Sequence, residues 1–138
     1  DPKSGGSSEY FLNNILNREA FAPSVQPYAG STTNSIAKVA ANPGAIGYAT
    51  ASEVCNQNTI KPLAIAQEAG TNFVSPCDGD TVNSVVIANN SYPITRRLFV
   101  IIKNDNSLDE QAGKAYVNLI LSEEGQQLVE EAGLIRIR

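Results

Sequence analysis

The chain has 138 residues, of which 42% are hydrophobic and 17% charged, and its formal net charge is −4. This length fits a single domain over residues 1–138, and the hydrophobic content is sufficient for a packed core, which argues against disorder. The acidic balance and the lack of a long basic cluster exclude nucleic acid as an expected partner, and no apolar run reaches the length of a membrane span.

The sequence contains no histidine, so it lacks the commonest general base and metal ligand. We therefore expect neither a serine-type triad nor a zinc enzyme, and we predict no metal and no other cofactor. The two cysteines, Cys55 and Cys77, flank a polar segment. Because the count is even, a disulfide between them is favoured over a metal site, and it would stabilise the fold by roughly 3 kcal/mol. Two buried free thiols are the alternative.

The first candidate site is a stretch of small residues that leads into an expected helix over residues 7–19. Its members are Ser4, Gly5, Gly6, Ser7 and Ser8. The first turn of a helix leaves backbone N–H groups without partners, and the helix dipole places partial positive charge there. Glycines allow a ligand to approach the backbone and hydroxyls add donors, so the stretch predicts an anion site. The alternative is that Ser7 or Ser8 only caps the helix while the glycines make a turn.

Helices and strands alternate along the rest of the chain. Capping signals predict helices that begin near residues 31–33 and at Thr50, Thr81, Ser107 and Ser122, and glycine predicts helix ends near Gly44 and Gly133. Apolar runs predict strands over residues 45–49, 60–66, 98–102 and 134–138, with residues 98–102 buried on both faces. Residues 70–80 are expected to be an irregular surface segment. Such alternation is typical of an α/β domain with some parallel pairing.

Four motifs, in the same order along the chain, resemble one family, the phosphate-binding proteins that feed ABC importers. Residues 5–11 are similar to the phosphate loop at the start of that family's second lobe. The other three are residues 35–48, which look like a segment of the second lobe, residues 92–96, which look like the hinge passage, and residues 121–133, which look like the C-terminal helix pair. Residues 55–80 match poorly.

The resemblance implies a periplasmic-binding-protein-like fold of type II, in which a mixed sheet is flanked by helices and two lobes close on a ligand. Residues 1–95 would correspond to the second lobe, and residues 96–138 to a C-terminal segment that completes the first lobe, most of which is missing. Because the chain begins at Asp1 rather than Met, we expect a mature, processed or excised fragment.

The resemblance also implies a function, that of a non-enzymatic solute-binding component, or fragment, of a phosphate ABC import system. The implied location is periplasmic or extracellular, and a lipid anchor in the full-length precursor stays open. The implied ligand is phosphate or a similar oxyanion. A missing first lobe, a second copy of the chain and a membrane permease are the macromolecular partners left open.

The candidate site departs from the family at two places. The family loop reads Ser-Gly-Thr where this chain has Gly5, Gly6 and Ser7, so one hydroxyl is lost. The family arginine three residues before the loop is replaced by Asp1, whose charge would repel an oxyanion, and Lys3 would compensate only as a mobile point charge. These departures leave an alternative function: a ligand-free interaction or sensor domain of the same fold that pairs with another chain.

Charged residues elsewhere do not indicate an enzyme. We interpret Glu123 and Glu124 as solvated acids in the first turn of a helix, where the dipole favours them. We expect the pair Arg96 and Arg97 to be a hinge or surface feature rather than an anion clamp. The terminal arginines, Arg136 and Arg138, are expected to be solvated.

Overall fold

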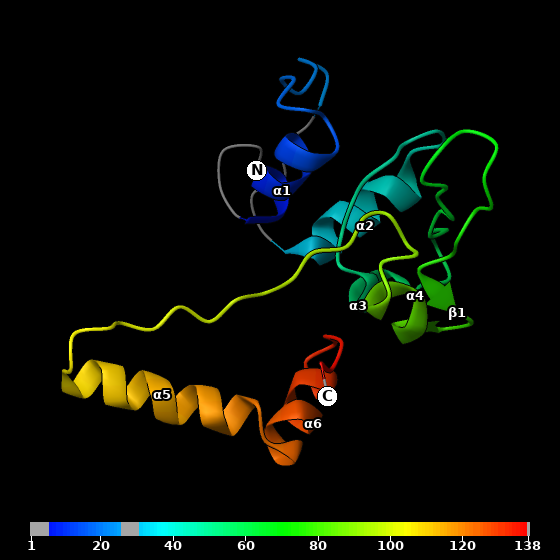
Figure 1. Ribbon diagram of the computed structural model, residues 1–138. Helices are drawn as coiled ribbons and strands as arrows, with labels where there is room; N and C mark the ends of the chain where they lie inside the picture. Colours follow the sequence, from blue (N-terminus) through cyan, green and yellow to red (C-terminus); the bar gives the residue numbers. More distant parts are fainter. Residues whose placement is uncertain (1–5, 26–30, 138) are drawn as a thin grey trace. The chain divides into compact units, whose positions relative to one another are not determined.

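The structure is a computed structural model that describes residues 6–25 and 31–137 (Figure 1). The chain divides into two compact units, Asp1–Lys61 and Pro62–Arg138. The mixture of helices and strands agrees with an α/β domain, whereas the two-lobe details and the single domain over residues 1–138 stay predictions.

The N-terminal unit begins with α1, Gly6–Asn14. The expected helix over residues 7–19 is therefore correct only in its first part. It ends early because Asn17 and Arg18 have positive φ angles of 49° and 67°, a left-handed conformation that cannot continue a right-handed helix.

The second helix, α2, spans Thr32–Ala41, with Ser31 as its N-cap residue, and it contacts the short helix α3, Ala51–Val54. The predicted end of α2 is confirmed, since Gly44 has a φ of +82°. The strand predicted over residues 45–49 is wrong, because these residues form no regular element. Gly47 nevertheless lies close to α2: a Cβ added to it would be 3.1 Å from Val39 Cγ2.

The C-terminal unit contains a small antiparallel hairpin, in which β1, Cys77–Asp78, pairs with β2, Thr81–Val82. Residues 70–80 are otherwise irregular and mostly exposed, as predicted: within this range only Cys77–Asp78 form a strand, and Val74 forms a single bridge. The strand predicted over residues 60–66 is wrong, since only Ile65 pairs, through a single bridge to Val74.

The helix that follows the hairpin is α4, Ser84–Ala88. Its N-cap is Asn83 rather than the predicted Thr81, which lies in β2. The Asn83 side chain accepts a hydrogen bond from the backbone N–H of Val86 at 3.4 Å. The prediction failed because Thr81 pairs with Asp78 across the hairpin. Thr81 is therefore part of a strand, and the helix can begin only after that strand has ended.

Two longer helices, α5 (Leu108–Ile120) and α6 (Glu123–Glu131), pack against each other. Both predicted N-caps are confirmed. Ser107 accepts a hydrogen bond from the N–H of Glu110 at 3.3 Å, and Ser122 accepts one from the N–H of Gly125 at 3.1 Å. Gly133, with a φ of 76°, follows the end of α6 as predicted.

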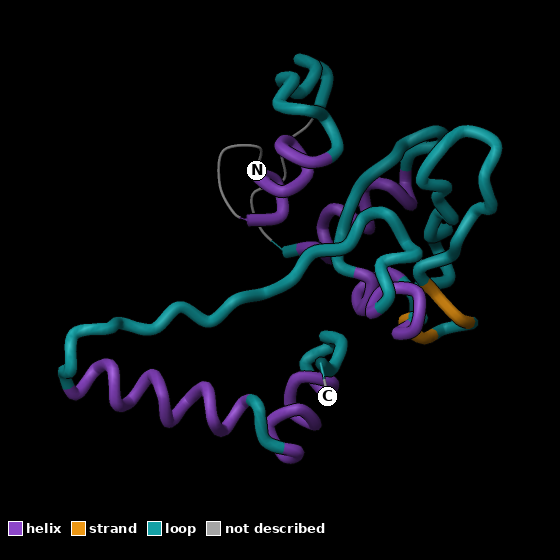
Figure 2. Tube along the Cα trace, in the orientation of Figure 1, coloured by secondary structure: helices purple, strands orange, loops and turns teal. Residues whose placement is uncertain are grey.

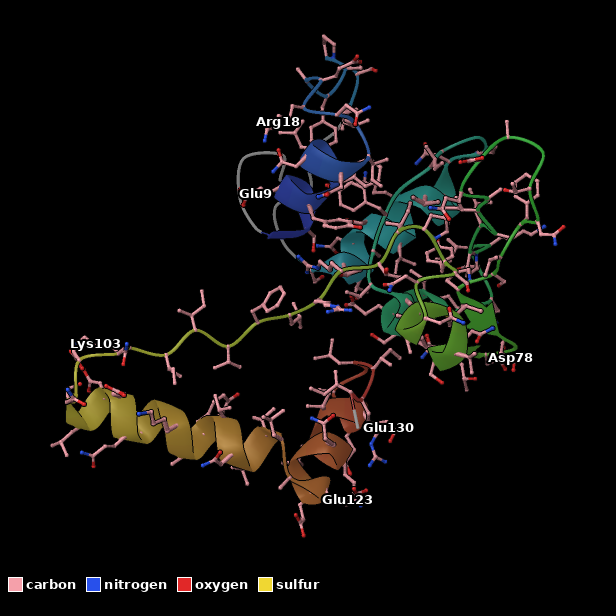
Figure 3. The ribbon with its side chains drawn as sticks, viewed as in Figure 1. Glu9, Arg18, Asp78, Lys103, Glu123 and Glu130 are labelled. Atoms are coloured by element: carbon pink, nitrogen blue, oxygen red, sulfur yellow. The ribbon has the colours of Figure 1, made fainter. Side chains whose placement is uncertain are left out.

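The segment after α6 is not the predicted strand, because its described part, residues 134–137, has no regular structure. It is held by Gln126, which accepts a hydrogen bond from the N–H of Ile137 at 2.8 Å. The expectation that Arg136 is solvated is wrong, because it forms ion pairs with Glu123 and Glu130. These two glutamates lie on α6 and are labelled in Figure 3. Arg138 lies outside the described residues.

Residues 98–102 are the largest departure from the sequence-based expectation. They were predicted to be a strand buried on both faces, but they form an extended segment without secondary structure that leads into α5 (Figure 2). All five side chains are exposed, and Ile101 reaches 92%. The prediction was wrong because an apolar run becomes a strand only where another strand pairs with it.

Cys55 is buried, with 5% of its surface exposed, whereas many large apolar side chains of the described residues are exposed. Both Cys55 and Cys77 are disulfide-bonded, which confirms the predicted bridge. Among the helices of the described residues, none combines the length and the hydropathy that crossing a bilayer requires.

Candidate anion-binding site

The sequence-based site falls at the start of α1. Ser4 and Gly5 lie outside the described residues. Gly6, Ser7 and Ser8 are the first three residues of α1, and they differ in exposure: Gly6 and Ser7 are exposed, whereas Ser8 is buried with 6% of its surface exposed. A ligand in solvent could therefore reach Gly6 and Ser7 directly, whereas Ser8 is buried.

Ser8 is held by a tyrosine from a distant part of the sequence. The Tyr48 hydroxyl donates a hydrogen bond to Ser8 Oγ over 3.2 Å. A serine hydroxyl that accepts one hydrogen bond still carries its own hydrogen for donation. Tyr48 thus fixes the position of Ser8 Oγ without using its donor capacity.

An aromatic stack beside this hydrogen bond supports Tyr48. Phe11, three residues after Ser8 on α1, stacks on the Tyr48 ring with 4.4 Å between ring centroids and 8° between ring planes. Phe21 stacks on Phe11 at 6.3 Å and 12°. Aromatic pairs of this kind stabilise beyond the area they bury, so the stack holds α1 against the segment that carries Tyr48.

The turn after α2 determines where Tyr48 lies. The N–H of Asn42 bonds to the carbonyl of Val39 at 3.2 Å, and the N–H of Ala45 bonds to the carbonyl of Asn42 at 3.0 Å. The chain then returns past α2, where Gly47 fits against Val39 because it has no side chain. Tyr48 is the next residue, and it reaches α1.

Sequence reasoning quoted Tyr48 within a family motif but gave it no role. The available signal was an aromatic residue placed directly after a glycine that was expected to lie close to another element. The partner, Ser8, was not identifiable, since the two residues are 40 positions apart.

The helix dipole and a nearby carboxylate have opposite effects on anion binding at the start of α1. The helix dipole favours an anion there, but Glu9 in the first turn is exposed and carries negative charge (Figure 3). Within the described residues, no group of three histidine, cysteine, aspartate or glutamate side chains could hold a metal ion. The donors for an anion at this place are backbone N–H groups and serine hydroxyls.

Comparison with protein families identifies the superfamily of the chain. A family model described as a PBP superfamily domain matches residues 1–124. The chain belongs to the PBP superfamily. This match confirms the periplasmic-binding-protein-like resemblance and covers the start of α1, Tyr48 and both cysteines. Comparison with curated proteins gives no match, and comparison with solved structures gives none either.

Membership of the PBP superfamily supports a solute-binding function and a small-molecule ligand. The serine and glycine residues at the start of α1 and the aromatic stack behind them form the candidate place for such a solute.

Proposed function

We propose that this PBP-superfamily chain is a solute-binding component of a phosphate ABC import system, and that it binds an inorganic oxyanion at the start of α1. The observation that carries the proposal is the exposed helix start at Gly6 and Ser7, backed by Ser8 and Tyr48. The backbone N–H groups of a first helical turn point along the axis toward such a ligand. The proposed ligand residues are Ser4, Gly5, Gly6, Ser7 and Ser8.

Ser7 and Ser8 have different proposed roles. Ser7 is exposed and would donate its hydroxyl hydrogen directly to an oxyanion oxygen. Ser8 would donate from a fixed position, because its oxygen already accepts from Tyr48. Such donors bind through hydrogen bonds and the helix dipole, without a side-chain cation.

The expected affinity of this chain alone is low. Glu9 opposes the anion, and Asp1 stands where the resembling family has an arginine, which would give a two-pronged contact. The proposed location is periplasmic or extracellular, which the disulfide supports because such bonds persist in oxidising compartments. We propose binding rather than catalysis, as the superfamily suggests.

Titration calorimetry of the full chain with inorganic phosphate and with sulfate tests the oxyanion site. The expected dissociation constant is in the millimolar range. Ser7→Ala should weaken it by roughly fivefold, the loss of about one hydrogen bond. Ser31→Ala is the matched control, because Ser31 is also an exposed serine at a helix start but belongs to α2. An unchanged affinity in Ser7→Ala would remove the start of α1 as the site.

A second function, pairing with another polypeptide, is favoured by a separate observation. Residues 98–102 are five consecutive apolar residues whose side chains are all exposed. Exposed extended segments of this kind pair readily with the edge of another sheet. We propose this pairing as the alternative function of the chain.

A further inference from the structure

At the end of α1 the local sequence and the structure disagree. The sequence predicts a helix through residue 19, and the leucine, arginine and glutamate within residues 16–19 favour one. The helix nevertheless ends at Asn14, and Asn17 and Arg18 have left-handed φ angles of 49° and 67°. Asparagine adopts this conformation readily, whereas the backbone of Arg18, an exposed residue, is strained by it (Figure 3). Conflicts of this kind are typical of strained or functional places.

The backbone hydrogen bonds of this turn can be exchanged for those of a longer helix. The N–H of Leu16 bonds to the carbonyl of Phe11 at 3.1 Å. The N–H of Arg18 bonds to the carbonyl of Leu12 at 2.8 Å. In a helix continued through residue 19, each of these N–H groups would bond instead to the carbonyl four residues before it. Extension therefore costs no backbone hydrogen bond and relieves the strain at Arg18.

Phe21 opposes this extension. The left-handed turn returns the chain, so that the Phe21 ring stacks on the Phe11 ring with 6.3 Å between centroids and 12° between planes. A helix rises about 1.5 Å per residue, so a longer α1 would place residue 19 about 12 Å along the axis from Phe11. Phe21, two residues further on, would leave the stack. An aromatic pair and the strain of one left-handed residue are similar in free energy, so the stack can balance the strain.

The same stack supports the start of α1. Phe11 also stacks on Tyr48, with 4.4 Å between ring centroids, and the Tyr48 hydroxyl donates to Ser8 Oγ. If Phe21 left the stack, Phe11 would lose one of its two ring contacts, and Tyr48 would be held less firmly. A change at the end of α1 would therefore reach the buried hydroxyl at its start.

We propose that α1 has two states, the short helix and a helix extended through residue 19, and that a latch selects the short one. The latch consists of the left-handed residues Asn17 and Arg18 and the stacked ring of Phe21. Its role rests on the proposed oxyanion function: the closed latch fixes Ser8 through the aromatic stack and so regulates anion binding. By linkage, an anion that binds the short state more tightly also favours the closed latch.

Two variants should open the latch in different ways. Phe21→Ala removes the ring, whereas Asn17→Ala keeps every ring and replaces a residue that tolerates positive φ by a better helix former. NMR chemical shifts and short-range NOEs of the full oxidised chain should show left-handed residues at 17 and 18 in the natural chain and helix over residues 15–19 in both variants. Phe73→Ala is the matched control, because Phe73 is a 72% exposed phenylalanine of the other unit.

Glycine at position 18 tests the latch by rescue. Glycine adopts positive φ without strain and disfavours a helix. Arg18→Gly combined with Phe21→Ala should therefore return residues 15–19 to the short state, although the ring is still missing. If Phe21 only contributed apolar packing, a change at position 18 would not restore the turn.

Calorimetry with inorganic phosphate tests the regulatory role. If Phe21→Ala leaves about one third of the chain in the short state, the apparent dissociation constant should rise about threefold. Adding Arg18→Gly to this variant should return the constant toward that of the natural chain. Phe73→Ala should leave it unchanged.

The outcomes separate the latch from the oxyanion site. If residues 15–19 stay left-handed in both Phe21→Ala and Asn17→Ala, or form no helix in either, the latch is wrong whether or not phosphate binds. A switch to helix with unchanged phosphate affinity would overturn the regulatory role. If the natural chain binds no phosphate, the oxyanion function and the regulatory role fail together, and the NMR data still decide whether α1 has two states.

Discussion

The start of α5 and the start of α1 differ in the side chains that lie near the backbone N–H groups of the first helical turn. At α5, Ser107 accepts from the N–H of Glu110, and the Glu110 carboxylate accepts from the N–H groups of Asp105 and Asn106 at 2.7 and 2.6 Å. At α1, the residue that precedes the helix is Gly5, which has no side chain that could accept a hydrogen bond. The buried hydroxyl of α1, on Ser8, bonds to Tyr48.

The difference separates a structural helix start from a candidate binding site. At the start of α5, the N–H of Glu110 and the N–H groups of the two residues Asp105 and Asn106 bond to side chains of the same chain, so these donors are not available to a ligand. The start of α6 is similar, with Ser122 as its cap. At α1, Gly6 and Ser7 are exposed and Ser8 is buried, and the residue directly before them in the sequence, Gly5, has no side chain. Substitutions at these three helix starts should therefore have unlike effects.

The largest expected effect is at the start of α6, where Gly125 is buried against the end of α5. A Cβ added there would overlap the carbonyl oxygen of Leu119 and lie 2.7 Å from Ile120 Cα. Because these are backbone atoms, Gly125→Ala should destabilise the fold by about 3 kcal/mol, measured by urea unfolding followed by circular dichroism.

Gly113→Ala on α5 is the matched control for Gly125→Ala. Its added Cβ would meet the side chain of Ile102 rather than backbone, and alanine gains about 1 kcal/mol of helix propensity over glycine. The loss of stability should therefore be small. Equal losses in the two variants would contradict the steric explanation for Gly125.

A smaller effect is expected on acidification, which acts on the start of α5. The hydrogen bond from Lys114, together with those from the N–H groups of Asn106 and Asp105, lowers the pKa of Glu110, whose side chain is 4% exposed. Burial of the carboxyl opposes this shift. A carboxylate with a lower pKa in the folded state adds stability above its unfolded pKa, and this stability is lost as pH falls through the folded pKa.

Thermal melts between neutral and acid pH would measure the contribution of Glu110. The natural chain should lose stability as pH falls below the ordinary range of a glutamate. Glu110→Gln should be less stable at neutral pH and should show a flatter dependence. An unchanged slope in Glu110→Gln would indicate that other carboxylates, such as Asp105, whose pKa Ser107 and Lys103 lower, dominate.

The smallest of these effects are expected at the caps themselves. Ser107→Ala and Ser122→Ala should each cost about 1 kcal/mol, because each hydroxyl accepts from a backbone N–H of its helix. Ser31→Ala should cost only a few tenths of a kcal/mol, since Ser31 makes no side-chain cap hydrogen bond at α2. A loss at Ser31 as large as at Ser107 would mean that exposure of the serine, rather than capping, sets the cost.

The sequence predicted the ends of the helices better than it predicted the strands. The caps at Ser107 and Ser122 and the ends at Gly44 and Gly133 are interactions between residues a few positions apart, so the local pattern contains both partners. The predicted strands at residues 45–49, 60–66, 98–102 and 134–138 needed partners from elsewhere in the chain. A hydrophobic run alone does not show whether such a partner exists.

In the candidate site, too, the local features were predictable from the sequence and the long-range contact was not. The serine and glycine stretch and its place at a helix start were visible in the sequence, as was the family resemblance that the PBP superfamily match confirms. The hydrogen bond from Tyr48 to Ser8 was not visible, because it joins two segments through the turn after α2 and the fit of Gly47 against Val39. The oxyanion itself stays a prediction.

The amino-acid sequence by itself indicated the superfamily and the places where α2, α5 and α6 begin or end, because short-range bonds decide the helix ends. For Cys55 and Cys77 the sequence favoured a disulfide over two free thiols, and the structure decided between them. The tertiary structure decided that Tyr48 holds Ser8 and that residues 98–102 extend without a sheet partner among the described residues. The contact between Tyr48 and Ser8 joins residues far apart along the chain, so its formation requires closing a long loop and packing specific neighbours.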